Sequence, residues 1–201
     1  MILCIETATT VCSAALCDEN GVHGVAGAPP GMSHAAQLTI IIHELMKDNR
    51  ITATDLDAVA VSKGPGSYTG LRIGVSAAKG IAYGAGIPLI AINTLEAMCS
   101  GFISLYPEDL KPGTLLCPMI DARRMEVYNS IFTADGKQVR ETAATIIDKD
   151  SFSDFLTGNR VIFFGNGAEK CRGTITHPGA LFREGFILSA SYLHIPSVNA
   201  M

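Results

Sequence analysis

The sequence predicts an α/β protein built from two similar lobes, and three observations support this fold class. Apolar strand-like runs alternate with segments whose apolar residues recur at the helical period. A pattern of strand, carboxylate, short turn and second strand occurs twice, beginning at residue 2 and again at residue 115. A polar stretch with two prolines, residues 107–113, separates the copies. We therefore expect lobes at 1–106 and 107–201, each a mixed sheet with flanking helices.

The first half contains a strand hairpin followed by alternating helices and strands. Turn residues after each apolar run set the boundaries, and Ser33 and Ser67 are placed to cap two helices. The prolines and glycine at 29–31 interrupt the chain before the first helix. The predicted strands are 1–5, 11–16, 21–26, 56–61 and 87–92, and the predicted helices are 33–47, 67–83 and 94–105.

The second half repeats the opening of the first in a shorter form. Strands are predicted at 115–120, 126–132 and 161–164, with a short helix at 151–156. The turn Gly165-Asn166-Gly167 is expected to lead into another helix. A helix starting at Pro196 would have too few residues to be stable alone, so we expect the natural protein to continue and this lobe to be truncated at its C-terminal helix.

Composition restricts the possible functions. The 201 residues are 48% hydrophobic and 17% charged, with a net charge of −4, so no basic face for independent nucleic-acid binding is predicted. The six cysteines form no CxxC pair and are read as reduced core residues of a cytoplasmic protein. The N-terminus lacks a signal-peptide pattern, and no apolar run reaches the roughly 18 residues that a membrane helix requires.

The first long helix, 33–47, has one apolar face for the sheet and a second set of residues on its far side. The sheet-facing residues are expected to be Ala35, Leu38, Ile41, Ile42, Leu45 and Met46. The far side carries Ala36 and Ile40, with His43 beside them. These three residues are considered together with the second helix, which carries a further apolar surface.

The second long helix, 67–83, has more apolar surface than one sheet can cover. Its polar residues form one narrow stripe, and each interior glycine costs about 1 kcal/mol relative to alanine. Gly70, Gly74 and the pair Ala77-Ala78 recur at every third or fourth position and form a ridge of small residues along the helix. Such a ridge is typical of close approach by another helix, so we predict a protein-binding surface. The alternative is a neighbour within the same chain. The predicted partner-binding residues are Ala36, Ile40, His43, Gly70, Ile73, Gly74, Ala77, Ala78 and Ile81.

The sequence shows little sign of catalytic chemistry. The strand ends and the glycine-containing turn before the second helix are possible nucleotide or anion sites, although residues in such positions more often only cap a turn. No P-loop lysine follows the turn, and the histidines lack metal-ligand spacing, so neither catalytic nor metal-binding residues are predicted. The possible nucleotide or anion residues are Glu6, Thr7, Gly66, Ser67, Asp121 and Arg123.

Several segments resemble the TsaB (YeaZ) family. The string KGPGSYTGLRIG at 63–74 carries the resemblance, with IETAT at 5–9, DARRMEVY at 121–128 and GNGA at 165–168 matching in order. The resemblance covers nearly the whole chain. It implies an actin-like (ASKHA, ribonuclease H-like) two-lobe fold related to TsaD and to the M22 glycoproteases. Glu6 departs from the family, whose members often have aspartate there.

The resemblance also implies a function. It indicates a non-catalytic subunit required for threonylcarbamoyladenosine (t6A) modification of adenosine 37 in tRNAs that read ANN codons. The implied partners are a TsaD-like catalytic subunit and a TsaE-like ATPase, with a homodimer in isolation and tRNA reached only through the complex. The subunit alone is expected to bind no cofactor, although the complex uses ATP. The alternative is a stand-alone actin-like ATP-dependent enzyme or a metallopeptidase.

Overall fold

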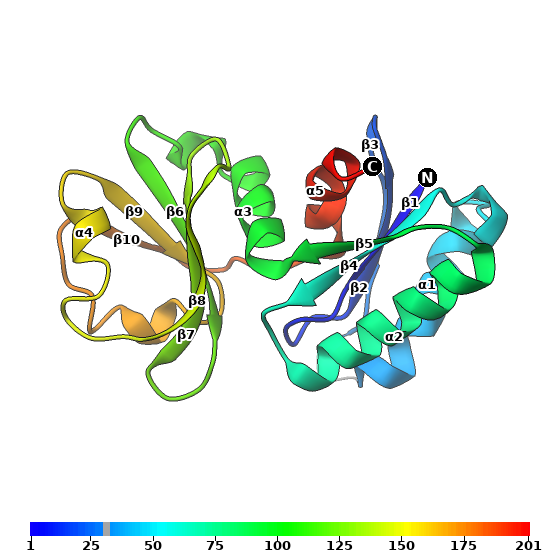
Figure 1. The fold of residues 1–201 in the computed structure, drawn as a ribbon, viewed down its shortest axis with the longest axis horizontal. Coiled ribbons are helices and arrows are strands. Elements are labelled where there is room, and N and C mark those ends of the chain that lie inside the picture. Colours follow the sequence, from blue (N-terminus) through cyan, green and yellow to red (C-terminus); the bar gives the residue numbers. More distant parts are fainter. Residues whose placement is uncertain (30–32) are drawn as a thin grey trace. The chain divides into compact units, whose positions relative to one another are not determined.

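The computed structural model describes residues 1–29 and 33–201, which form two compact units (Figure 1). The first unit contains Met1–Ala97 and Leu188–Met201, and the second contains Met98–Ile187. The boundary therefore falls within a helix rather than at 106/107. The final segment, expected in the second lobe, packs with the first. The chain interruption predicted at 29–31 lies largely outside the described residues.

The first unit is built on a five-stranded mixed sheet in the order β3-β2-β1-β4-β5. The hairpin strands β1, β2 and β3 are antiparallel, whereas β4 runs parallel to β1, and β5 runs parallel to β4. All five strands were predicted. Their ends lie within two residues of the predicted ones, except for the end of β4, which lies three residues further along. Their bounds are Ile2–Glu6, Ser13–Asp18, Gly21–Gly27, Ala58–Gly64 and Leu89–Asn93.

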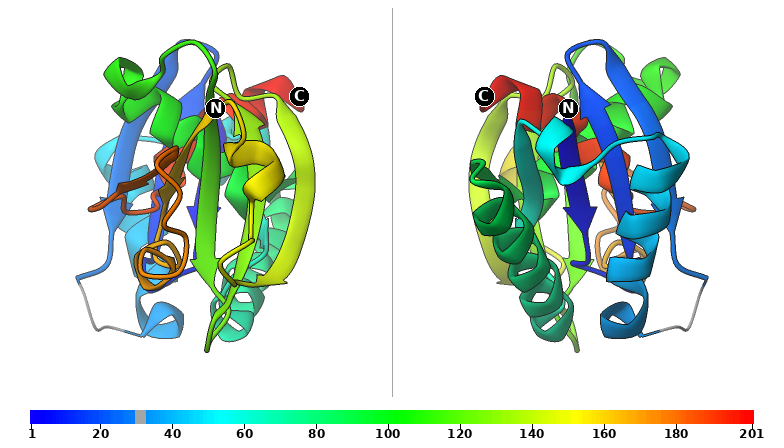
Figure 2. Two further views of the ribbon diagram at one scale, coloured as in Figure 1. Left: turned by 90° about the vertical axis from the view of Figure 1, so that its left-hand side faces the viewer. Right: turned by 90° about the vertical axis from the view of Figure 1, so that its right-hand side faces the viewer.

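Helices cover both faces of this sheet (Figures 1 and 2). The long helices α1 (His34–Asp48) and α2 (Tyr68–Ala85) pack on the face that includes Leu3 and Ile5. The other face is covered by the beginning of α3, by η4 and by α5, which is why the central strands are apolar on both sides. The remaining helical bounds are Ala53–Asp55 (η1), Thr94–Leu105 (α3), Ala190–Leu193 (η4) and His194–Asn199 (α5).

The second unit repeats the strand connections of the first. Its sheet order is β10-β9-β6-β7-β8, with β6, β7 and β8 antiparallel and β9 and β10 added in parallel. This correspondence confirms the repeat predicted from the sequence. Strands β8 and β10 were not predicted. The bounds are Thr114–Asp121, Glu126–Thr133, Gln138–Ile146, Arg160–Phe164 and Ala180–Arg183.

The second unit has short helical segments between its strands. Helix α4 (Ser153–Leu156) contains four residues and lies within the predicted range. The helix predicted after Gly165-Asn166-Gly167 is wrong, because only the single 3-10 turn η3 (Glu169–Cys171) forms there. A further 3-10 turn, η2 (Pro107–Asp109), precedes β6. A phenylalanine-rich core holds the unit together, with Phe163 fully buried between Phe152 and Phe182.

The two serine caps predicted from the sequence behave differently. The Ser67 hydroxyl accepts a hydrogen bond of 3.2 Å from the Gly70 amide, as expected for a helix N-cap. Ser33 occupies the N-cap position of α1, but its side chain makes no capping hydrogen bond. The α2 N-terminus is thus fixed by its own sequence, whereas α1 begins without that contribution.

Candidate functional site

A groove between α1 and α2 in the first unit could receive a partner. Its volume is about 490 Å³. The walls alternate apolar side chains with the hydroxyl groups and single guanidinium of the α2 N-terminal half. The lining residues are Ala35, Leu38, Thr39, Tyr68, Thr69, Arg72, Ile73, Ser76 and Ala77.

The predicted far side of α1 is exposed as expected. Ala36 and His43 are exposed, and Ile40 has 52% of its surface accessible, which is high for a large apolar side chain. The sheet-facing prediction is confirmed for Leu38 and its neighbours on that face, but Ala35 is exposed at the groove instead. α1 therefore presents an apolar stripe to solvent beside the groove.

The small-residue ridge of α2 does not face a second protein. Gly70, Gly74 and Ala78 are buried. A Cβ atom added at Gly70 would lie far inside van der Waals distance of the Thr7 carbonyl oxygen, and one at Gly74 would overlap the Thr7 hydroxyl. These three residues are therefore a correction to the predicted partner-binding set. The close approach that the glycines allow is between α2 and the end of β1 in the same chain.

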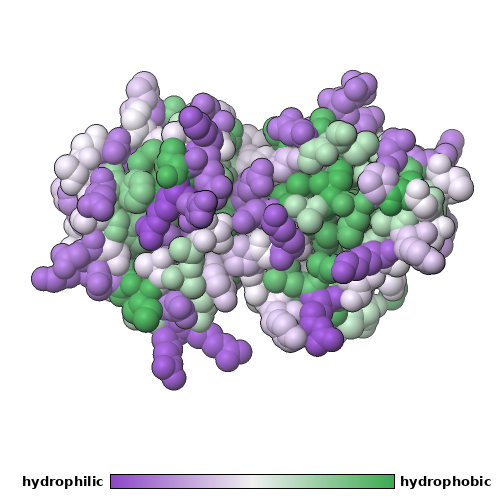
Figure 3. All heavy atoms as spheres, viewed as in Figure 1, coloured by the Kyte–Doolittle hydropathy of each residue, from purple (hydrophilic) through white to green (hydrophobic). Residues whose placement is uncertain are grey.

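The remaining predicted residues of α2 lie at the edge of the buried face. Ile73, Ala77 and Ile81 are half-buried, and the first two line the groove. The polar stripe of α2 is exposed along its whole length; it consists of Arg72, Ser76, Lys79 and Tyr83. The Arg72 guanidinium lies 5.5 Å from the centre of the Tyr68 ring. Figure 3 shows green apolar residues interrupted by purple polar ones over the side of the first unit that α2 occupies.

The carboxylate at the end of β1 is buried rather than open. Glu6 has no accessible surface, and its carboxylate accepts hydrogen bonds from the Ser62 hydroxyl and from the Ala8 amide at 2.5 Å. Burial raises the pKa of Glu6 to about 7, although these hydrogen bonds and one from Thr7 act in the opposite direction. Glu6 is thus partly protonated at neutral pH.

The turn that joins β4 to α2 closes onto the end of β1. The Ser67 amide donates to the Ala8 carbonyl over 2.7 Å, and a Cβ atom at Gly66 would overlap that same carbonyl. The Gly64–Pro65 peptide bond in this turn is cis. The structure therefore brings Glu6, Thr7, Gly66 and Ser67 together, and the first amides of the turn are already bonded within the chain.

The corresponding carboxylate of the second unit has a different environment. Asp121 is exposed, and its carboxylate binds the Lys170 ammonium and accepts the Arg123 amide at 2.8 Å. Lys170, followed by smaller contributions from Arg123, lowers the pKa of Asp121. Lys170 also donates to the backbone carbonyls of Arg124 at 2.8 Å and Glu126 at 2.7 Å. Sequence analysis does not place Lys170 beside Asp121, because the two residues lie 49 positions apart in the chain.

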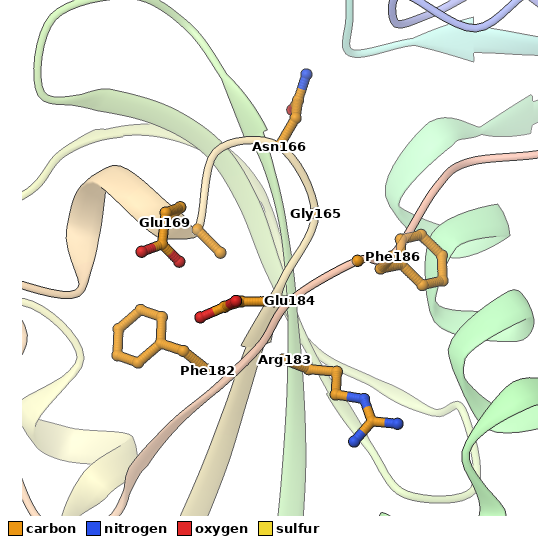
Figure 4. Close-up of a pocket in the computed structure, with 9 residues that line it drawn as sticks. Gly165, Asn166, Glu169, Phe182, Arg183, Glu184 and Phe186 are labelled. Atoms are coloured by element: carbon orange, nitrogen blue, oxygen red, sulfur yellow. The ribbon is translucent and has the colours of Figure 1, made fainter.

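A pocket of about 260 Å³ lies within the second unit, between the segment that follows β9 and the end of β10. In Figure 4 the carboxylates of Glu169 and Glu184 point to the same side as Phe182, whereas Arg183 points to the opposite side. The guanidinium of Arg172 bridges the two carboxylates at 3.0 and 2.6 Å. The pocket therefore presents paired carboxylates and aromatic rings.

The remaining findings also concern the described residues, 1–29 and 33–201. No group of three or more His, Cys, Asp or Glu side chains there could hold a metal ion. No described helix is both long and apolar enough to cross a membrane. All six cysteines are buried and form no disulfide. His34, which showed no functional pattern in the sequence, contacts the Thr9 carbonyl at 3.0 Å through its ring Nε2.

Comparison with known structures identifies the fold. A crystal structure from Pseudomonas aeruginosa, described as an uncharacterized protein with similarity to peptidase YEAZ, superposes with a TM-score of 0.82 at 22% identity. That match covers 99% of this chain and 89% of the other. An inorganic polyphosphate/ATP-glucomannokinase from Arthrobacter matches with a TM-score of 0.50 at 13% identity, over 99% and 97% of the two chains. The fold is therefore the actin-like fold, as predicted.

Comparison of sequences identifies the family. A family profile described as TsaD, tRNA N6-adenosine threonylcarbamoyltransferase, matches residues 18–169. The tRNA threonylcarbamoyladenosine biosynthesis protein TsaB of Escherichia coli is 36% identical over 67% of this chain and 55% of its own length. TsaB of Bacillus subtilis is 33% identical over 65% of this chain and 54% of its own. The chain thus spans about half the length of the curated relatives it matches. The chain belongs to the TsaD family of tRNA N6-adenosine threonylcarbamoyltransferases, and within it the TsaB proteins are its relatives.

Proposed function

We propose that this chain is a non-catalytic subunit required for the t6A modification of adenosine 37 in tRNAs reading ANN codons. It acts by pairing with a TsaD-like catalytic subunit, and a TsaE-like ATPase joins the complex. The names of the curated relatives place them in threonylcarbamoyladenosine biosynthesis, which supports the pathway. The pairing with a TsaD-like subunit and the non-catalytic role of this chain are proposed here in addition to the pathway.

The observation that carries the proposal is the surface formed by α1 and α2. Ile40 projects from α1 with half of its surface accessible, and Ile73 and Ala77 are only half-buried at the groove wall. Exposed apolar side chains grouped beside a groove favour association with another protein. In the absence of the catalytic subunit the same surface pairs with a second copy of this chain.

The surroundings of Glu6 support a non-catalytic role. A carboxylate that acts on a metal-bound or nucleotide substrate needs an accessible oxygen, and Glu6 has no accessible surface. The space that a phosphate would need beside Gly66 is filled by the Ala8 carbonyl. The ATP consumed in the reaction is therefore bound by the other subunits, and this chain alone holds no cofactor.

The proposal is tested by placing a charge on the apolar stripe of α1. Ile40→Asp puts a carboxylate where the partner would bury an apolar side chain, so pairing with the TsaD-like subunit is expected to weaken at least tenfold. Sedimentation of the mixed subunits measures pairing, and t6A formation on a tRNA transcript measures activity. The monomer should keep its melting temperature, because Ile40 is already half-exposed.

Val25→Asp is the matched control. Val25 is 49% exposed on edge strand β3, and the substitution introduces the same charge into the same unit away from the groove. This variant should pair and support t6A formation like the wild type. Equal pairing by Ile40→Asp and the wild type, or a wild-type chain that forms no complex, would overturn the proposal.

A further inference from the structure

The turn between β6 and β7 contains an unusual pair of arginines. Arg123 and Arg124 have φ angles of 73° and 47°, in the left-handed region where residues with a Cβ atom are disfavoured. Glycine and asparagine are the residues that suit such positions. Two consecutive arginines there are a poor choice for stability, so a role for their side chains is indicated.

The neighbouring residues hold this turn rigidly. Lys170 binds the Asp121 carboxylate and the carbonyls of Arg124 and Glu126, and the Asp121 carboxylate accepts the Arg123 amide. The Asn166 side chain accepts the Asp121 amide at 3.1 Å. These contacts come from a different part of the sequence and fix the backbone, so the two arginines project from a preorganised turn.

The guanidinium groups themselves are left available. Both arginines are exposed, and neither side chain donates a hydrogen bond or forms an ion pair within residues 1–29 and 33–201. The Asp121 carboxylate, which accepts the Arg123 amide, is paired with Lys170. On a chain with a net charge of −4, this is a local pair of unneutralised positive charges.

We infer that Arg123 and Arg124 bind phosphodiester groups of RNA. Guanidinium groups bind phosphate oxygens with two parallel hydrogen bonds, which favours phosphate over a less specific counter-ion. In the adjacent pocket the carboxylates of Glu169 and Glu184 share the single cation of Arg172, and the remaining negative charge disfavours a free nucleotide. The turn is open and exposed, and this suits a polyanion that lies across it rather than a small molecule that needs enclosure.

The choice of RNA rests on the proposed function, in which the complex acts on tRNA. Within the complex, the inference adds a direct contact between this subunit and the tRNA backbone, remote in sequence from the α1 and α2 helices. Two phosphate contacts contribute affinity that decreases with salt and does not depend on the RNA sequence.

The test measures binding of a fluorescein-labelled tRNA transcript to the full chain, alone and mixed with the TsaD-like subunit. Arg123→Ala/Arg124→Ala is expected to weaken binding about tenfold and to reduce the slope of log affinity against log salt by about 1.4 to 1.8. Arg123→Gly/Arg124→Gly should weaken binding equally while raising the melting temperature, because glycine accepts positive φ angles. ATP serves as a competitor and should displace the tRNA poorly.

The matched control is Lys137→Ala/Lys149→Ala, which removes two exposed charges elsewhere in the second unit. This control should change tRNA affinity less than twofold. Unchanged affinity in both arginine variants would overturn the inference, as would efficient displacement by ATP. A loss of pairing with the TsaD-like subunit would show that the arginines contact protein, which also overturns it. Failure of the wild-type subunits to pair concerns the proposed function alone, because the chain-only titration still compares the variants.

Discussion

The two units share one sheet topology but differ in the elements that connect their strands. Between β3 and β4 the first unit has the 15-residue helix α1, where the second has the four-residue α4. Between β4 and β5 it has the 18-residue α2, where the second has a three-residue 3-10 turn. One copy of the repeat thus builds a two-helix surface, and the other supports little more than its own core.

The carboxylates at equivalent strand ends show the same divergence. Glu6 is buried without a cation and has a raised pKa, whereas Asp121 is exposed, binds Lys170 and has a lowered pKa. The first unit uses this position to join β1 to the β4–α2 turn, and the second uses it to fix the arginine turn. Under the two roles proposed above, the repeated framework separates protein binding in the first unit from anion binding in the second.

The largest predicted effect tests how closely α2 packs on β1. Gly70→Ala would drive a Cβ atom into the Thr7 carbonyl, and a backbone atom cannot move aside as a flexible side chain could. We expect a loss of about 3 kcal/mol in the free energy of unfolding, at the upper end for overpacked sites. Urea denaturation measures the change.

Gly80→Ala is the matched control in the same helix. A Cβ atom at Gly80 meets nothing within 4 Å, so alanine should stabilise the chain by about 1 kcal/mol through its higher helix propensity. If Gly70→Ala lowers the free energy of unfolding and Gly80→Ala raises it, the small residues Gly70, Gly74 and Ala78 face the sheet. If Gly70→Ala left stability unchanged, α2 would not pack against β1 as described.

A smaller effect separates the two carboxylates by pH. Because the folded state raises the Glu6 pKa from 4.5 to about 7, it binds more protons than the unfolded state in this range. The contribution of Glu6 to stability is therefore fully present below pH 4.5 and is lost as pH rises through 7. Between pH 5 and 8 the expected loss is about 2 to 3 kcal/mol, at roughly 1.4 kcal/mol per pKa unit.

Glu6→Gln should remove this dependence and leave the variant more stable than the wild type at pH 8. Asp121→Asn should remove a pH dependence of the opposite sign. The pKa of Asp121 is lowered in the folded state, so its contribution to stability is present at neutral pH and is lost as the pH falls. Its effect should be small, since the pair with Lys170 is partly exposed to solvent. Identical pH profiles for Glu6→Gln and the wild type would contradict the buried, raised-pKa carboxylate.

Hydrophobic patterning predicted most of the fold, and its failures have physical causes. The repeat and the first unit's strands followed from apolar runs ending at turn residues. Strand β8 was missed because it is an exposed strand at the sheet edge with many polar residues, and only β7 pairs with it. Strand β10 is short and half-buried throughout, so it carries no strong period.

The candidate site was predicted less completely because helix patterns do not show which neighbour covers a face. Gly70 and Gly74 indicated a close approach correctly, but the approaching segment is Thr7 of the same chain. Lys170 was missed because its partners lie 44 to 49 residues away. The positive φ angles of Arg123 and Arg124 carry no sequence signal, since arginine is not typical of such turns.

Hydrogen–deuterium exchange of the chain, alone and mixed with a TsaD-like subunit, tests most directly whether the long helices form the partner-binding surface. Slower exchange is expected only in α1 and α2, because pairing buries the apolar stripe around Ile40 and the groove beside it. The short helix α4 and strand β8 serve as internal references that should not change. Slower exchange in the second unit, with α1 and α2 unaffected, would contradict a partner-binding role for these two helices.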